Sequence, residues 1–132
     1  MTNKILWKPS DHEVTESNLF KFTQNINDKY GYNFNDYNDL YQWSVNELEK
    51  FWEEVWIFSN IKYSQKFTNI IKKDERIWKT KWFLNSKLNY AENLLKNKND
   101  NIAIYFFGED KLQTQITFNE LYSEVAKVAH SF

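Results

Sequence analysis

The chain has 132 residues, of which 42% are hydrophobic, and a formal charge of −1 from 17 basic and 18 acidic side chains. This composition suffices for one ordinary domain, or for a small domain and part of a second one. The even charge balance argues against nucleic acid as a partner. No apolar run reaches the length of a membrane span and the amino terminus does not resemble a secretory signal, so we expect no membrane partner. The absence of cysteine excludes disulfides and thiolate metal sites, and favours a cytoplasmic location.

Aromatic residues make up 19% of the chain and include six Trp. Each large ring buries a wide area when it packs and leaves an adhesive patch when it is exposed. We therefore expect the rings to build most of a core, and a partner surface to cover those that the core leaves open.

The first part of the chain predicts a helical cluster. Ser10 and Glu13 have the spacing of a capping box, and they open a helix that Gly31 ends. A shorter helix is expected from about Asp36 to Trp43.

A third helix is expected to begin at Val45, because Ser44 and Glu47 repeat the capping-box spacing. Its apolar stripe consists of Val45, Leu48, Phe51, Trp52, Val55 and Trp56, and its solvated face of Glu47, Glu49, Lys50, Glu53 and Glu54.

The middle of the chain has weaker patterns. Residues 61–84 predict irregular structure with one or two short strands, and a short helix follows with Asn89 and Glu92 as its cap pair. The polar run 96–101 has no apolar anchor and is the best candidate for a domain boundary.

The last part predicts a β-hairpin and a helix. Residues 102–107 form the first strand, and the alternation from Leu112 to Phe118 forms the second, with a turn around Gly108. Thr117 and Glu120 form another capping box. The following helix has an apolar stripe, which still runs at the last residue and consists of Leu121, Val125, Val128, Ala129 and Phe132. A hairpin with one helix cannot cover two sheet faces, so we expect this part to begin a larger α/β domain that continues beyond the chain.

No catalytic or ligand-binding constellation stands out. Gly31 and Gly108 lie too far apart for a phosphate loop, and His12 and His130 have no second ligand at metal-binding spacing. Adjacent helix residues point about 100° apart, so Glu53 and Glu54 cannot flank one glycosidic bond and are interpreted as a solvated face. We therefore predict no catalytic, cofactor-binding or metal-binding residue in this chain.

A second alternative is a groove for single-stranded nucleic acid. Its lysines would be Lys62, Lys66, Lys72, Lys73, Lys79 and Lys81, interleaved with the rings of Phe67, Trp78 and Trp82. The charge balance and the acidic pair Asp74-Glu75 favour ordinary surface lysines over buried rings.

Several segments, in this order, resemble the amino-terminal region of acetoacetyl-CoA synthetases. They are Leu6-Trp7-Lys8-Pro9-Ser10, residues 37–40 followed by Trp43-Ser44-Val45, Phe51-Trp52 with Val55-Trp56-Ile57-Phe58, Trp82-Phe83 and Leu88-Asn89-Tyr90-Ala91-Glu92-Asn93-Leu94-Leu95. The segment Ile116-Thr117-Phe118-Asn119-Glu120-Leu121 resembles the start of the large domain of adenylate-forming ligases in general. One departure is Asn85, where the family pattern often has glycine.

The resemblance implies an α+β fragment. Its residues 1–96 would be a mainly helical amino-terminal cap domain, and residues 101–132 the start of a truncated AMP-binding large α/β domain. The full-length enzymes join acetoacetate to coenzyme A through an acyl-adenylate, with ATP, Mg²⁺ and CoA, none of which we expect this segment to bind. The expected partner is the remainder of the ligase. The alternatives are another short-chain synthetase, for acetate or propionate, or a non-enzymatic helical interaction module.

Overall fold

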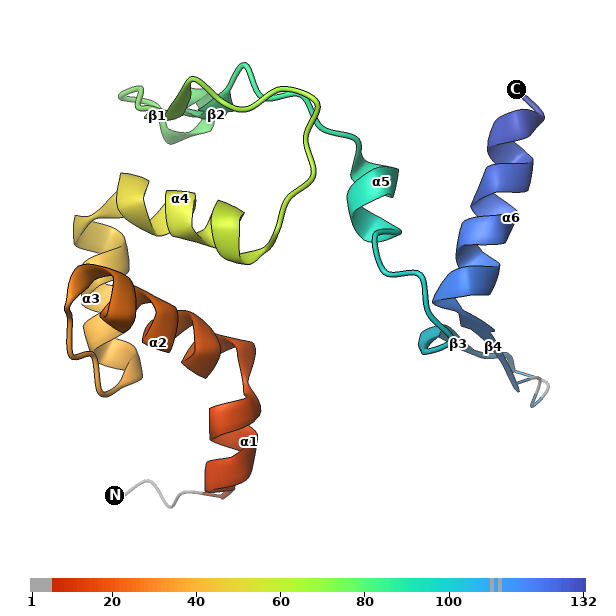
Figure 1. Ribbon diagram of the computed structural model, residues 1–132, viewed down its shortest axis with the longest axis horizontal. Helices are drawn as coiled ribbons and strands as arrows, with labels where there is room; N and C mark the ends of the chain where they lie inside the picture. Colours follow the sequence, from red (N-terminus) through yellow and green to blue (C-terminus); the bar gives the residue numbers. More distant parts are fainter. Residues whose placement is uncertain (1–5, 110, 112) are drawn as a thin grey trace. The chain divides into compact units, whose positions relative to one another are not determined.

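The computed structural model describes residues 6–109, 111 and 113–132 and separates them into two compact units. Unit 1 contains residues 6–60 and 69–84, and unit 2 contains residues 61–68 and 85–132. The chain therefore passes between the units after residues 60, 68 and 84. Figure 1 shows the elements in chain order. The mainly helical first part and the antiparallel hairpins confirm the α+β prediction. The division into domains at 1–96 and 101–132 stays a prediction.

Unit 1 begins with two helices where one was predicted. Helix α1 spans Asp11–Glu16 and α2 spans Asn18–Tyr30, because Ser17 adopts an extended backbone between them. The Ser17 hydroxyl accepts a hydrogen bond from the Phe20 amide at 3.1 Å and donates one to the Val14 carbonyl at 2.7 Å. It thereby closes one helix and caps the next.

The ends of this helical pair agree with the sequence. Ser10 and Glu13 form the predicted capping box, and its hydrogen bonds lower the pKa of the Glu13 carboxyl, chiefly through the Ser10 hydroxyl. Gly31 ends α2 in the left-handed conformation, with φ of 68°, which glycine adopts without steric cost.

Helices α3, Tyr37–Asn46, and α4, Leu48–Phe58, follow with a break at Glu47. The predicted capping box at Ser44 is wrong, because Ser44 lies inside α3 and its hydroxyl donates to the Tyr41 carbonyl at 2.8 Å. Glu47 occupies the N-cap position of α4 without a side-chain capping bond, and it pairs with Lys50 at 2.8 Å instead. Helix α4 therefore begins three residues later than predicted.

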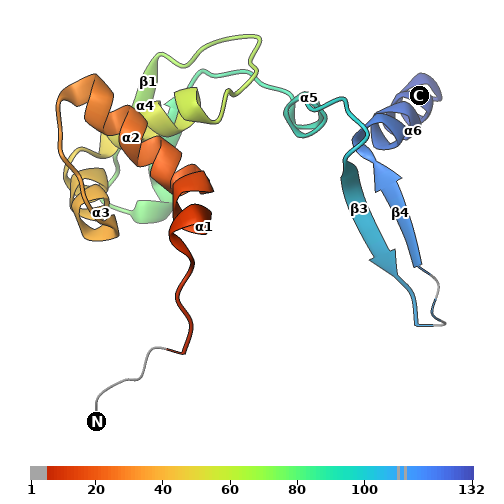
Figure 2. The same ribbon diagram turned by 60° about the horizontal axis from the view of Figure 1, so that its bottom comes forward.

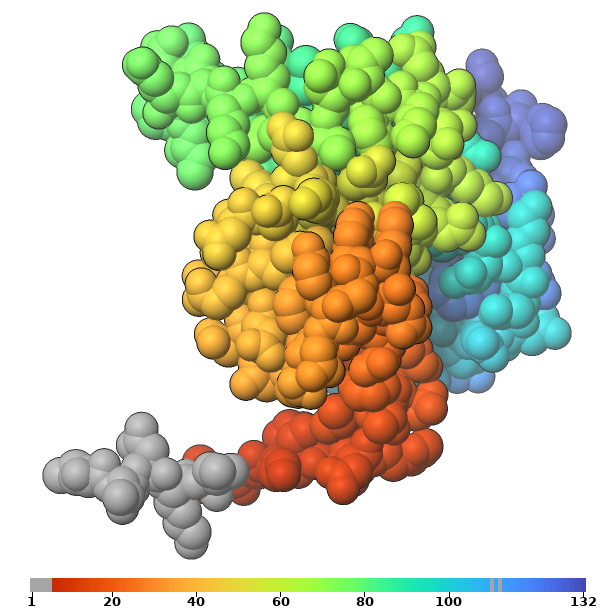
Figure 3. All heavy atoms as spheres, turned by 60° about the vertical axis from the view of Figure 1, so that its left-hand side comes forward, coloured from red at the N-terminus to blue at the C-terminus, as the bar shows by residue number. Residues whose placement is uncertain are grey.

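The core of unit 1 lies where α2 and α3 meet, and it consists of Phe22, Ile26, Leu40 and Trp43. Half-buried rings of Tyr30, Tyr32, Phe34 and Phe51 surround it. The rings of Phe22 and Phe51 meet edge to face at 6.0 Å, and those of Trp43 and Phe51 do the same at 6.0 Å. Figure 3 shows α2, α3 and α4, coloured orange to yellow-green, in close contact.

The predicted stripe of α4 is confirmed in part. Trp56 is buried and packs against the Phe83 ring at 4.8 Å, and Phe51, Trp52 and Val55 are half-buried. Val45 belongs to α3 and is 49% exposed. Its predicted place in the stripe is wrong, because the helix break at Glu47 changes the register.

A small antiparallel hairpin completes unit 1. Strand β1, Asn69–Lys72, pairs with β2, Lys81–Leu84, and the short 3₁₀ helix η1, Ile77–Lys79, lies in the loop between them. The prediction of one or two short strands in this region is confirmed.

Unit 2 contains the short helix α5, Tyr90–Leu94, capped as predicted by the Asn89 side chain. The Asn93 side chain joins α5 to the segment 61–68 of unit 2. It accepts a hydrogen bond from the Lys62 amide and donates one to the Lys62 carbonyl, both at 2.8 Å. Asn85, at the start of this part, has a left-handed backbone with φ of 63°. That conformation favours glycine, and asparagine is among the residues that also tolerate it.

The predicted hairpin and final helix are confirmed. Strand β3, Ile102–Phe107, pairs antiparallel with β4, Gln113–Thr117, with an irregularity near Ile102, and α6, Phe118–His130, follows directly. Thr117 and Glu120 form the predicted capping box. Figure 2 shows α6 beside the two strands. Two residues expected in the second strand differ: Leu112 lies outside the described residues, and Phe118 is the first residue of α6.

Candidate functional site: an uncovered hairpin and helix

The most unusual surface of unit 2 is strand β3. Its residues Ile104, Tyr105, Phe106 and Phe107 are 43%, 65%, 49% and 69% exposed. Successive strand residues point to opposite faces, so apolar side chains lie open on both faces of the hairpin. Rings of this size normally lie under a neighbouring element.

Helix α6 adds to this uncovered surface. Val125 is 37% exposed and Val128 57% exposed, although both belong to its predicted apolar stripe. In the described part of unit 2, β3 and β4 pair only with each other, so the outer edge of each strand has backbone groups that no third strand satisfies. We call β3, β4 and α6 together the open face.

The base of the open face is well ordered. The Asn101 and Asn99 carbonyls accept hydrogen bonds from the Phe118 and Asn119 amides, at 3.0 Å and 3.1 Å, which satisfies donors at the start of α6. The Lys98 ammonium lies 3.8 Å from the centre of the Tyr122 ring. The Glu120 carboxyl has a lowered pKa, chiefly because the Thr117 amide donates to it. The polar run 96–101 therefore holds the helix in place.

The acidic pair in α4 does not form a two-carboxylate site. Glu54 is buried at 7% exposure, and its Oε1 accepts from Lys29 at 2.6 Å and from the Tyr30 hydroxyl at 2.9 Å. The prediction of a solvated face is therefore wrong for Glu54. Burial and the hydrogen bond to Glu54 raise the pKa of Tyr30, and the same hydrogen-bonding carboxylate raises that of Lys29. The sequence pattern could not reveal this contact, because its partners lie on α2.

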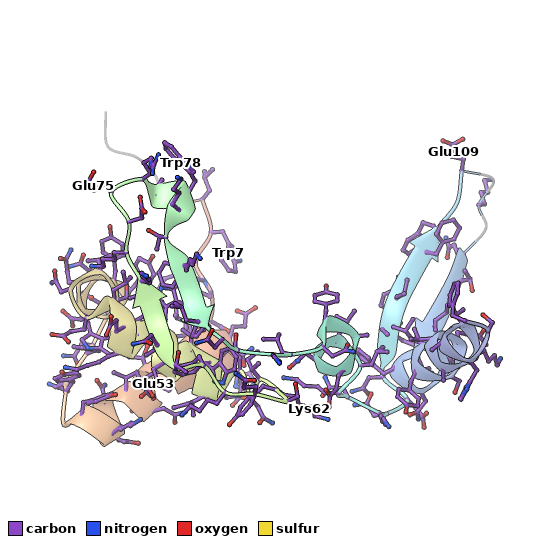
Figure 4. All side chains as sticks on the ribbon, turned by 90° about the horizontal axis from the view of Figure 1, so that it is seen from above. Trp7, Glu53, Lys62, Glu75, Trp78 and Glu109 are labelled. Atoms are coloured by element: carbon purple, nitrogen blue, oxygen red, sulfur yellow. The ribbon has the colours of Figure 1, made fainter. Side chains whose placement is uncertain are left out.

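In residues 62–82, where surface lysines over buried aromatic rings were predicted, the structure agrees only in part. The lysines are exposed, and Phe67 is half-buried beneath the Lys66 ammonium at 5.2 Å. Trp82 is 43% exposed and Trp78 is 77% exposed, so the expectation of buried rings is wrong for both. Figure 4 shows Trp78 and Glu75 at the tip of the β1–β2 hairpin.

Unit 1 also contains an open hollow of about 360 Å³ near Ser17, Phe20, Phe34 and Tyr37. Asp36 lines it, but its carboxylate caps α3 by accepting from the Asp39 amide at 3.0 Å. The hollow thus offers no uncommitted acid for chemistry.

The residues that the sequence analysis considered as metal or phosphate ligands do not come together in the described part of the chain. His12 and His130 are both exposed, and the described residues contain no cluster of three potential metal ligands. Gly31 serves as a helix cap and Gly108 lies in the hairpin turn, so neither belongs to a phosphate loop. That this segment binds neither ATP nor Mg²⁺ stays a prediction. None of its helices, as far as they are described, is long and apolar enough to cross a membrane.

Comparison with known proteins agrees with this anatomy. Residues 37–94 match the family described as acetyl-coenzyme A synthetase N-terminus. The chain is 40% identical to acetoacetyl-CoA synthetase of Danio rerio and 41% identical to that of Xenopus tropicalis, over 98% of its own length in both cases. The chain corresponds to the amino-terminal region of acetoacetyl-CoA synthetases.

A solved structure supports this relation. The acetoacetyl-CoA synthetase from Streptomyces lividans matches 98% of this chain with a TM-score of 0.81 and 25% sequence identity. The chain spans about a fifth of its relatives: 19% of the Danio rerio and Xenopus tropicalis acetoacetyl-CoA synthetases and 20% of the solved one. The predicted resemblance to the amino-terminal region of acetoacetyl-CoA synthetases is confirmed, and the open face lies at the carboxyl-terminal end of the matched region.

Proposed function

We propose that this chain serves as the amino-terminal segment of an ATP-dependent acetoacetate-CoA ligase. In that enzyme acetoacetate, ATP and CoA would give acetoacetyl-CoA, AMP and pyrophosphate through an acyl-adenylate. The observation that carries the proposal is the similarity to acetoacetyl-CoA synthetases along 98% of the chain. The relatives named for acetoacetate favour that acid over acetate or propionate.

The segment would act as a scaffold. The proposed cap, residues 1–96, and the proposed start of the AMP-binding domain, residues 101–132, would pack on the remainder of the ligase in the cytoplasm. ATP, Mg²⁺ and CoA would bind to that remainder, because Gly31 and Gly108 lie too far apart in this chain to form a phosphate loop. The open face supports this role, since its rings and strand edges suit the extension of a larger sheet.

A fusion tests the proposal. The first 132 residues of the fusion would be this chain, and the rest would be the part of the Danio rerio relative beyond its matched region. We expect it to release AMP in the presence of acetoacetate, ATP and CoA, whereas the isolated chain and the isolated remainder should not. An inactive fusion beside an active intact relative would contradict the proposal, and so would AMP release by the isolated chain.

The exposed rings also suit a second candidate, a free-standing interaction module. This candidate predicts that the isolated chain is monomeric and unfolds cooperatively, because a free-standing module folds without a further domain. The ligase segment should instead aggregate through the open face and unfold without a sharp transition. Gel filtration and urea unfolding of the purified chain separate the two candidates.

A further inference from the structure

The loop of the β1–β2 hairpin has a surface that the fold of unit 1 does not use. We call residues 72–81 the basic tip. Lys72 and Lys81 are paired at its base, and η1 lies within it. Ile77 and Trp78 on η1 are 84% and 77% exposed. They are among the most exposed large apolar side chains in the described part of unit 1.

Local hydrogen bonds hold this loop in shape. The Asp74 amide donates to the Thr80 hydroxyl at 3.2 Å, and the Arg76 amide donates to the Asp74 carboxylate at 3.0 Å. The Lys79 amide donates to the Arg76 carbonyl at 2.8 Å. The loop is thus an ordered turn that presents Ile77 and Trp78 outwards, and such preorganised apolar anchors lower the entropic cost of binding.

Charge surrounds the two apolar side chains. The basic tip contains five basic residues, Lys72, Lys73, Arg76, Lys79 and Lys81, and two acidic ones, Asp74 and Glu75, whereas the whole chain has a formal charge of −1. Asp74 is already paired with Arg76, at 3.6 Å. A partner surface that complements the basic tip is therefore an apolar pocket whose rim is mainly acidic and also carries one or two cations.

We propose that the basic tip docks into such a pocket on the remainder of the ligase polypeptide, with Trp78 and Ile77 as its anchors. This inference rests on the proposed function, and about four-fifths of the length of the relatives lies outside the matched region. An anionic membrane is the less suitable occupant, because Glu75 lies beside the anchors at the hairpin tip (Figure 4) and would meet headgroups of like charge. A protein pocket can offer partners of opposite charge to both the basic and the acidic side chains of the tip.

Cysteine labelling tests the docking, because the chain has no cysteine of its own. In a Trp78→Cys variant the new thiol should react rapidly with a maleimide in the isolated chain. In the active fusion described above, the same position should react at least about tenfold more slowly, since docking buries it. Equal labelling rates of both proteins in urea control for intrinsic reactivity, and peptide mass spectrometry identifies the labelled position.

A second variant tests the contribution of the anchors. Trp78→Ala combined with Ile77→Ser should leave the Tm of the isolated chain within about 1 °C, because both side chains are exposed there. In the fusion the same change should lower the Tm by about 3 °C or more. Trp7→Ala, a change of another exposed Trp outside the basic tip, is the matched control.

The outcomes separate this inference from the proposed function. An active fusion in which position 78 reacts as fast as in the isolated chain would overturn the docking and leave the function standing. An inactive fusion in which position 78 is also labelled as fast as in the isolated chain would overturn both the docking and the proposed function. A blue shift of Trp fluorescence in the isolated chain with phosphatidylserine vesicles, lost in Trp78→Ala, would overturn the docking in favour of a membrane partner.

Discussion

The Lys29 ammonium lies 2.6 Å from Oε1 of Glu54 and joins the last turn of α2 to α4. The lysine side chain is 50% exposed, whereas the glutamate side chain is 8% exposed. Water can therefore solvate the cation but hardly reaches the carboxylate. The hydrogen bonds from Lys29 and from the Tyr30 hydroxyl therefore compensate the cost of burying the Glu54 carboxylate in the folded state.

Removing the cation should destabilise unit 1. In Lys29→Met the buried carboxylate keeps only the Tyr30 hydroxyl, so we expect the free energy of unfolding to fall by about 1–3 kcal/mol. Lys50→Met is the control, because its pair with Glu47 is exposed on both sides and should contribute about 0–1 kcal/mol. Urea unfolding followed by Trp fluorescence measures both, and equal losses would show that the Glu54 contact has no special role.

The same contact predicts how stability changes in alkali. The pKa values of Lys29 and Tyr30 are both raised in the folded state, so the unfolded state loses these protons first. Stability should be complete below about pH 10 and should fall as the pH rises towards the folded-state pKa values. Glu54→Gln should make this alkaline fall shallower, as a pH series of unfolding curves can show.

In acid, the two capping boxes should lose strength. The pKa values of Glu13 and Glu120 are lowered by hydrogen bonds at their N-caps, so the unfolded state binds protons first as the pH falls. Their contribution is present above the ordinary glutamate pKa of about 4.3 and is lost as the pH falls through the folded value. Glu120→Gln should remove the acid dependence of α6 helicity, which NMR chemical shifts of that helix would report. An unchanged titration would contradict the capping role.

Ser17 and Ser44 provide a matched pair of substitutions. Ser17 caps α2, so Ser17→Ala should cost about 1 kcal/mol. Ser44 lies inside α3 and caps no helix, so Ser44→Ala should change stability by less than about 0.5 kcal/mol. If thermal unfolding gave the reverse order, the helix boundaries described above would be wrong.

Asn85 tests whether its position requires a left-handed backbone. Its left-handed backbone predicts that Asn85→Gly stays within about 0.5 kcal/mol of the natural chain, although the hydrogen bond from Asn85 to the Thr68 hydroxyl at 3.0 Å is lost. Asn85→Leu should cost about 1–2 kcal/mol, because a leucine is strained in this conformation. Lys87→Leu, at a nearby exposed position, controls for added apolar surface.

Features that depend on nearby residues could be predicted from the sequence. Gly31, Asn89 and the capping boxes at Ser10 and Thr117 are confirmed, because each forms hydrogen bonds within a few residues of itself. The β3–β4 hairpin is confirmed for the same reason, since its strands are close in sequence.

Features that depend on competition or on distant partners could not be predicted. Ser44 and Glu47 have the spacing of a cap, but α3 continues through Ser44 because Trp43 packs in the core. The burial of Glu54 requires Lys29 and Tyr30, which lie 25 and 24 residues away. The exposure of Trp78 depends on a loop shape that periodicity does not encode.

Hydrogen exchange of β3 and β4 tests most directly whether the open face is built to be covered by a larger ligase domain. In the isolated chain, the amides at the outer strand edges should exchange rapidly, because no third strand pairs with them. In the fusion with the Danio rerio remainder, we predict that the same amides exchange about two orders of magnitude more slowly. Equal exchange in an active fusion would contradict the claim that this hairpin begins a larger sheet.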